Sequence, residues 1–155
     1  MISFLPYNTI EDKEDAMKKE DKKIVIIDGQ GGKMGQSVIA QFKKSFPSLS
    51  VIAIGTNSIA TSAMLKAGAD AGATGENPVL VASRDADIII GPIGIVIADS
   101  LLGEITPAMA EAIGKSRAYK ILIPVNKCNH HVVGCENLTL TESIALVIKE
   151  VENHL

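Results

Sequence analysis

Residues 24–35 read Ile-Val-Ile-Ile-Asp-Gly-Gln-Gly-Gly-Lys-Met-Gly, a short aliphatic run that passes directly into a cluster of glycines. The run 24–27 is β-branched and contains no polar residue, which predicts a strand buried on both faces of a sheet. Apolar residues at helical spacing follow as far as Phe46, so a helix is expected from about Met34. The glycines therefore join a buried strand to an amphipathic helix.

The same alternation of strand and helix continues along the chain. Further strands are expected at 51–54, 87–90 and 120–125, and further helices at about 57–68, 79–86, 106–114 and 139–155. Residues 69–78 are expected to be a loop or a short irregular strand, and the aliphatic run 93–102 is compatible with either a helix or a strand. This order predicts an α/β fold, a Rossmann-like, doubly wound and mainly parallel sheet in a single domain.

Length and composition agree with one domain. The chain has 155 residues, of which 46% are hydrophobic and only 3% aromatic. Such aliphatic chains favour parallel strands covered by helices. In residues 11–23 eleven of thirteen side chains are charged, so residues 1–22 are expected to form an N-terminal extension, helical or disordered, outside a domain of residues 23–155.

Charge and hydropathy exclude several classes of partner. The net charge is −3, which argues against binding of nucleic acid or of anionic membranes. No apolar run reaches the roughly 20 residues that a membrane-spanning helix needs, and no signal peptide is apparent. We therefore expect a cytoplasmic protein, in which Cys128 and Cys135 are thiols or ligands.

The glycine cluster is the strongest indication of a binding site. A turn between a strand and a helix needs residues without a Cβ, and the amides of the helix N-terminus attract phosphate groups. The predicted cofactor-binding residues of this loop are Gly29, Gln30, Gly31, Gly32, Lys33, Met34 and Gly35. A purely structural tight turn is the alternative. A Walker A loop is disfavoured, because Gln36 precedes Ser37 where that motif has its lysine.

Two resemblances bear on this loop. Residues 29–35 are similar to the glycine loops of dihydrodipicolinate reductase and prephenate dehydrogenase, which implies a fold that binds a nicotinamide dinucleotide but transfers no catalytic residue, since both families have a second domain. Residues 24–155 resemble a family of small uncharacterised bacterial proteins with the stretches IDGQGG, GTN-x-IATSAMLKAGAD-x-GATGEN and IGPIGIVIADSLLGEITPAM. That second resemblance implies the fold and no activity.

The end of the second strand bears on the choice between NADP and NAD. Dinucleotide sites that prefer NAD usually place an acidic residue about 20 positions after the glycines. Here the tripeptide is Gly55-Thr56-Asn57, which contains no acid, and this favours NADP, with Thr56 and Asn57 as hydrogen-bond donors. The alternative role of Asn57 is to cap the helix that follows.

The remaining strand ends should lie at the same edge of the sheet. Gly91, Pro92, Ile93 and Gly94 are expected to form a rigid turn beside the ligand, with Asn126 after the fourth strand. Asp99 lies in an aliphatic stretch, and a buried aspartate needs a partner, so it is a helix cap or a catalytic candidate.

A cluster of cysteine and histidine follows the last predicted strand. Cys128 and His130 are candidates for a catalytic thiolate pair, and Cys128, His130, His131 and Cys135 are candidate ligands for a metal ion. The spacing matches no standard zinc motif, and a polar loop without a catalytic role is the alternative.

These observations predict a protein that binds NADP(H), NAD(H) or a related phosphate-bearing ligand, as a small reductase or a cofactor sensor. A homo-oligomer is expected to supply the missing wall of the site. A metal- or thiol-dependent protein and a non-catalytic interaction subunit remain the alternatives, and the sequence leaves open whether the protein is an enzyme.

Overall fold

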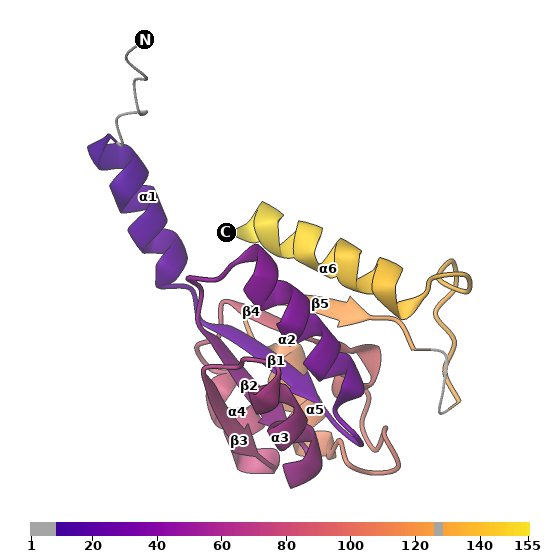
Figure 1. The fold of residues 1–155 in the computed structure, drawn as a ribbon. Coiled ribbons are helices and arrows are strands. Elements are labelled where there is room, and N and C mark those ends of the chain that lie inside the picture. The colour runs from indigo at the N-terminus through magenta and orange to yellow at the C-terminus, as the bar shows by residue number, and fades with distance from the viewer. Residues whose placement is uncertain (1–8, 126–128) are drawn as a thin grey trace.

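The sheet is parallel throughout and has the strand order β3-β2-β1-β4-β5 (Figure 1). The computed structural model describes residues 9–125 and 129–155, and within them the sheet has five strands. Their bounds are β1 (Ile24–Asp28), β2 (Val51–Gly55), β3 (Ala71–Thr74), β4 (Ile88–Pro92) and β5 (Tyr119–Ile123). The chain thus has the expected single-domain, doubly wound α/β fold.

Helices cover both faces of the sheet. One face carries α2 (Lys33–Ser45), α3 (Ser58–Lys66) and α6 (Leu140–His154), and the other carries α4 (Glu76–Ala82), α5 (Pro107–Lys115) and the 3-10 helix η1 (Ile93–Val96). Successive residues of β1 point to opposite faces, so Ile24 and Ile26 enter one apolar cluster and Val25 and Ile27 the other. Because both faces are buried, the strand is aliphatic at every one of these positions.

Three helices begin at the residues that the sequence predicts. The Oδ1 atom of Asn57 accepts a hydrogen bond from the amide of Ala60 at the start of α3. Thr106 caps α5, which has proline at its first position, and Thr139 with Glu142 forms a capping box at the start of α6. The predictions of these helix starts are confirmed, because a cap depends on residues within one turn.

One open expectation is resolved, and two other regions differ from what the sequence predicts. Within residues 69–78, expected to be a loop or a short irregular strand, residues 71–74 form the edge strand β3. Its sequence has no apolar alternation, so the strand depends on its pairing with β2. Gly91 and Pro92, expected in a turn, are the last residues of β4 and pair with β5. Pro92 is compatible with the end of a strand, where its missing N–H interrupts no further pairing. The run 93–102 is neither a long helix nor a strand, and only Ile93–Val96 is regular.

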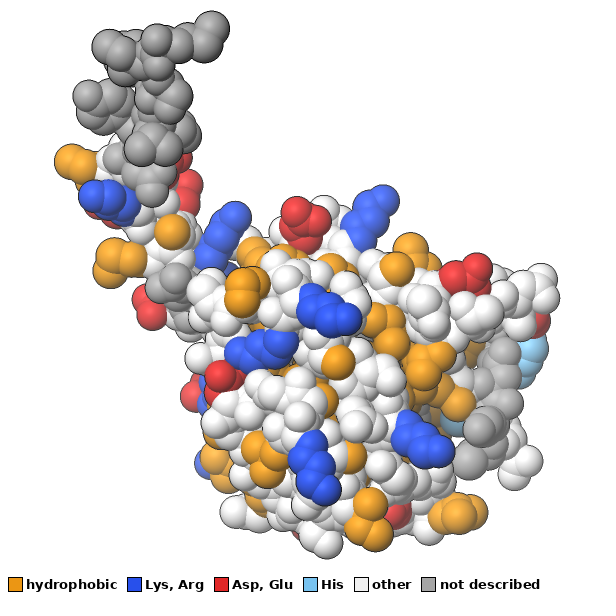
Figure 2. Space-filling model, viewed as in Figure 1, with side chains coloured by type: hydrophobic (Ala, Val, Ile, Leu, Met, Phe, Trp, Pro, Cys, Tyr) orange, Lys and Arg blue, Asp and Glu red, His pale blue; other side chains and the backbone are white. Residues whose placement is uncertain are grey.

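The charged segment forms a helix that extends away from the domain. Helix α1 (Ile10–Glu20) is capped by Thr9 with Asp12, and its described side chains are exposed. It projects from the domain in both the ribbon and the space-filling view (Figure 1, Figure 2). No helix within residues 9–125 and 129–155 combines the length and the apolar content that a membrane crossing requires.

Candidate functional site

A cavity of about 380 Å³ lies at the carboxyl edge of the sheet, beside the junction of β1 and β4. At this junction the chain reverses its direction across the sheet, which is where open α/β sheets bind their ligands. The cavity is lined by Asp28, Gly29, Gln30, Gly31, Gly32, Lys33, Met34, Pro92, Gly94, Ser100, Leu101, Val125, His130 and Leu140. It therefore brings most of the predicted glycine loop together with the end of β4 and with His130.

Asp28 holds the glycine loop through hydrogen bonds to its carboxylate. It ends β1, is only 6% exposed, and accepts hydrogen bonds from the amides of Gly29 (2.8 Å) and Gly35 (2.7 Å). Burial raises the pKa of its carboxyl, the two amides offset part of that rise, and the negative charge of Glu104 adds to it. Asp28 is not among the cofactor-binding residues that the sequence predicts, although an acidic residue at the end of a fully buried strand is a recognisable signal.

Packing within the protein explains three of the four loop glycines. A Cβ on Gly32 would lie 2.6 Å from the backbone of Ala60, and its φ of +70° also favours glycine. A Cβ on Gly35 would lie 2.5 Å from the sulfur of Met64 in α3. A Cβ on Gly29 would lie 2.7 Å from a carboxylate oxygen of Glu104. At these positions the tight-turn interpretation is sufficient.

Gly31 differs from the other three glycines. A Cβ placed on it would meet no atom of the described chain within 4 Å, and the residue is exposed and lines the cavity. Its backbone can therefore be approached closely by a group from outside the chain. The lack of a side chain at Gly31 is the one feature of the loop that internal packing leaves unexplained.

The loop also has backbone amides that are free to donate hydrogen bonds. Gly32 donates to the carbonyl of Gly29, and Gln30 donates to the carboxylate of Glu104 (2.7 Å). Within the described ranges the amides of Gly31 and Lys33 make no hydrogen bond. Lys33 is the first residue of α2, so its amide lies at the positive end of the helix dipole, and its exposed side chain adds a cation at the cavity.

On the β2 side the crevice is closed by Asn57 and Glu104. The Nδ2 atom of Asn57 donates to the carbonyl of Gln30 and to Glu104 Oε1, at 2.9 Å each. Thr56 Oγ1 is buried and has no hydrogen-bond partner in the described part of the chain. Thr56 and Asn57, predicted to contact a cofactor, do not line the cavity, and the helix-capping role of Asn57 is confirmed. No signal in the sequence singles out Glu104, which lies 47 residues from Asn57.

Asp99 is not the buried aspartate that the sequence suggests. Its side chain is exposed, its φ is +61°, and its amide donates to the carbonyl of Ile105 in an irregular turn. Aspartate is tolerated in this left-handed conformation better than most residues, which explains its position. The neighbouring Ser100 is the buried member of the pair: it lines the cavity, and its hydroxyl donates to the carbonyl of Gly94.

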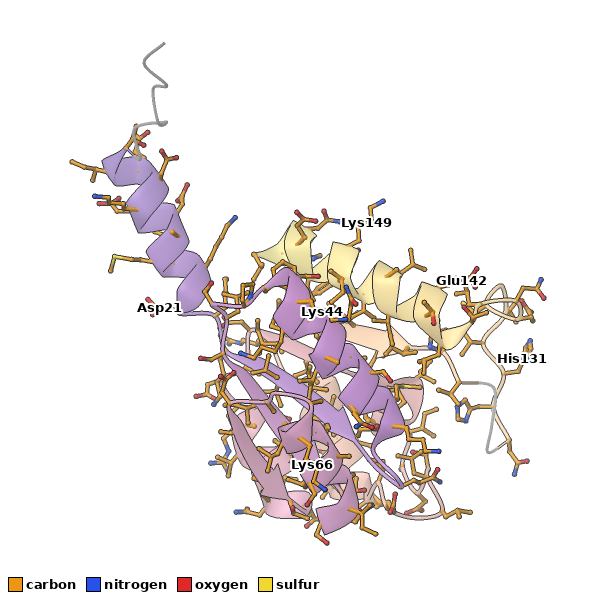
Figure 3. All side chains as sticks on the ribbon, in the orientation of Figure 1. Asp21, Lys44, Lys66, His131, Glu142 and Lys149 are labelled. Carbon is orange, nitrogen blue, oxygen red and sulfur yellow. The ribbon has the colours of Figure 1, made fainter. Side chains whose placement is uncertain are left out.

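The described members of the predicted cysteine and histidine cluster, His130, His131 and Cys135, lie in different surroundings. His130 is half-buried and lines the cavity, whereas His131 is exposed and contacts Glu136 at 3.0 Å, on the loop that precedes α6 (Figure 3). Cys135 lines a separate cavity of about 250 Å³ beside β5 and α6. Among residues 9–125 and 129–155 no three histidine, cysteine or acidic side chains are placed to hold a metal ion. Asn126 and Cys128 lie outside the described residues.

Comparison with known proteins assigns the chain to a family. No curated protein matches the sequence. The family model described as Domain of unknown function (DUF3842) matches residues 23–155, which include the whole sheet and its covering helices. The chain therefore belongs to the DUF3842 family.

Proposed function

We propose that this protein binds a dinucleotide, with a phosphate of the ligand on the amides of Gly31 and Lys33. The observation that carries the proposal is the open backbone at Gly31, together with the unbonded amides of Gly31 and of Lys33 at the N-terminus of α2. These are the features by which a glycine loop holds phosphate: close backbone approach, free N–H groups and a favourable helix dipole.

The rest of the cavity suits a flat, largely apolar group. Beyond the glycine loop four apolar residues line it, together with Gly94, Ser100 and His130, and its volume of about 380 Å³ falls within the range of small-molecule sites. The four apolar residues are Pro92, Leu101, Val125 and Leu140. A dinucleotide extends to both sides of the point at which the strand order reverses. One half of the ligand would then occupy this cavity, and the other half would lie toward β2. His130 supplies an imidazole at the cavity, which is also lined by Asp28 and Lys33, and a reductase of this kind could use it beside its substrate.

Substitution of Gly31 tests the proposal. Gly31→Val should abolish binding of NADH, NADPH, ATP or coenzyme A, whichever the parent binds in calorimetry, because the valine would fill the space where the phosphate approaches. The domain should still fold, since nothing in the described chain opposes a side chain there. Gly32→Val, in contrast, should destabilise the fold, because its Cβ would collide with the backbone of Ala60.

The matched control is Gly114→Val. Gly114 lies in α5 and is likewise open, so it should tolerate the same side chain without a change in ligand affinity. Binding by Gly31→Val that equals binding by the parent would show that the loop is only a turn. Absence of binding of all four compounds to the parent protein would contradict the proposed function itself.

A further inference from the structure

We infer that Glu104 makes this site selective for a dinucleotide whose adenosine ribose carries a free 2′-hydroxyl, as in NAD(H), over one that carries a 2′-phosphate. The inference rests on the proposed function and specifies its ligand. The tripeptide Gly55-Thr56-Asn57 contains no acid, which by itself favours NADP. The fold brings an acid to that place from a distant segment of the chain.

The carboxylate of Glu104 lies between the glycine loop and the end of β2. Its Oε2 atom is 2.7 Å from the amide of Gln30, and its Oε1 atom is 2.9 Å from Nδ2 of Asn57. It also lies directly against Gly29, the first glycine of the loop. In dinucleotide-binding sheets this is where an acid after the second strand accepts hydrogen bonds from the ribose hydroxyls.

Glu104 retains acceptor capacity for such a ligand. An ionised carboxylate offers about four acceptor positions, and here each oxygen accepts a single hydrogen bond from the described residues. Two positions therefore remain for the two hydroxyl donors of an unmodified ribose. The 2′-phosphate of NADP has no such donor when ionised, and its acceptor oxygens would face the acceptor oxygens of Glu104.

The local charge also disfavours a phosphate at this end. Asp28, which accepts a hydrogen bond from the amide of Gly29, is close enough for the charge of Glu104 to raise the pKa of its carboxyl. Glu104 thus adds a negative charge beside Asn57, at the β2 side of the loop, whereas Lys33 lines the cavity together with Asp28. Repulsion between like charges at such sites is a common source of discrimination between ligands.

The turn that carries Glu104 is held by its own contacts. The amide of Asp99 donates to the carbonyl of Ile105 (2.8 Å), the amide of Ile105 donates back to Ser100, and the side chain of Ile105 is fully buried. Glu104 is therefore anchored beside a buried residue. The carboxylate is therefore already held, without a ligand, in the position from which it would contact the ribose.

Calorimetry with NADH and NADPH on the parent protein is the direct test. We expect NADH to bind at least about tenfold more tightly, the discrimination that one charge contact typically supplies. Glu104→Gln keeps the size of the side chain but removes its charge, so the ratio of the two affinities should fall toward one, mainly because NADPH binds better. Glu152→Gln, an exposed position on α6, removes the same charge elsewhere and should leave the ratio unchanged.

The outcomes separate this inference from the proposed function. Tighter binding of NADPH to the parent, or an unchanged ratio in Glu104→Gln, would overturn the selectivity while dinucleotide binding stands. Equal gains for both ligands in Glu104→Gln would show that Glu104 merely closes the crevice, and would also overturn it. Binding of neither ligand to the parent would overturn both. If Glu104→Gln fails to fold by circular dichroism, the comparison of ADP-ribose with its 2′-phosphate on the parent protein decides.

Discussion

Asp28 shows how one buried carboxyl can organise a glycine loop. It joins the last residue of β1 to both ends of the glycine cluster through the amides of Gly29 and Gly35. The loop is thereby held in one shape, with Gly31 at its exposed point. The arrangement costs stability at neutral pH, because burial raises the pKa of this carboxyl and the charged form is the disfavoured one.

The stability of the fold should therefore depend on the charge of Asp28. At low pH the carboxyl is neutral in both folded and unfolded states. Above the unfolded value of about 3.9 the unfolded chain loses this proton first, so the free energy of unfolding falls as the pH rises through the folded pKa. Asp28→Asn removes this pH dependence of the free energy of unfolding, because asparagine does not titrate. Its NH₂ group would, however, face one of the two amides, at a cost of about 1–3 kcal/mol.

Urea unfolding from about pH 4 to pH 8 measures this effect. The deficit of Asp28→Asn relative to the parent should shrink as the pH increases. Asp99→Asn removes an exposed acid from the same edge of the sheet and serves as the matched variant for the loss of one negative charge. A difference between parent and Asp28→Asn that stays constant over this range would rule out a raised pKa at Asp28.

At the level of elements, the start of α3 is coupled to the glycine loop through one side chain. Asn57 caps α3 with its oxygen and reaches Gln30 and Glu104 with its nitrogen. A helix cap therefore also sets the position of the carboxylate at the β2 end. The start of α6 offers a comparison, because the side chain of Thr139 caps that helix by accepting a hydrogen bond from the amide of Glu142 in the same turn.

Two substitutions of Asn57 separate these roles. Asn57→Ser retains a good capping residue but loses both contacts of the nitrogen, whereas Asn57→Ala loses the cap as well, at a further cost of about 1 kcal/mol. We expect the free energy of unfolding to decrease from parent to serine to alanine. The free energy of unfolding of Thr139→Ser should match that of the parent, since the side chain at position 139 serves only as a helix cap. Equal stability of Asn57→Ser and the parent would show that the bridge to Glu104 contributes nothing.

At the scale of the molecule, the sheet and its helices form one body from which α1 projects. The described side chains of α1 are exposed, and the family match begins at residue 23, one residue before the start of β1. Its apolar side chains Ile10 and Met17 are largely exposed. Helix α1 therefore contributes little to the core.

Removal of residues 1–22 should leave the domain intact. We expect residues 23–155 to unfold with a free energy within about 0.5 kcal/mol of that of the full chain, the usual range for surface changes. Dinucleotide affinity should also be unchanged, because α1 does not line the cavity. Denaturant unfolding and calorimetry on both chains measure this. A loss of more than a few kcal/mol would show that the extension is part of the folded unit, as some terminal helices are.

Much of the fold was predictable because its signals are local. The aliphatic runs of β1, β2 and β4 and the caps of α3, α5 and α6 each depend on residues within a few positions of one another. The edge strand β3 was harder to predict, because Ala71–Thr74 has no apolar pattern of its own and is a strand only where β2 pairs with it. Gly91 and Pro92 carry turn signals in the sequence but extend β4 beside β5.

For the candidate site, the glycine loop and its place between a strand and a helix follow from the sequence, because consecutive residues specify them. The three-dimensional fold was needed to show which glycine faces open space, that Asp99 is exposed, and that His130 and Cys135 line different cavities. It alone placed Glu104 beside Gln30 and Asn57. The physical reason is that such contacts join segments far apart in the chain, and their distances depend on how the loops leave the sheet.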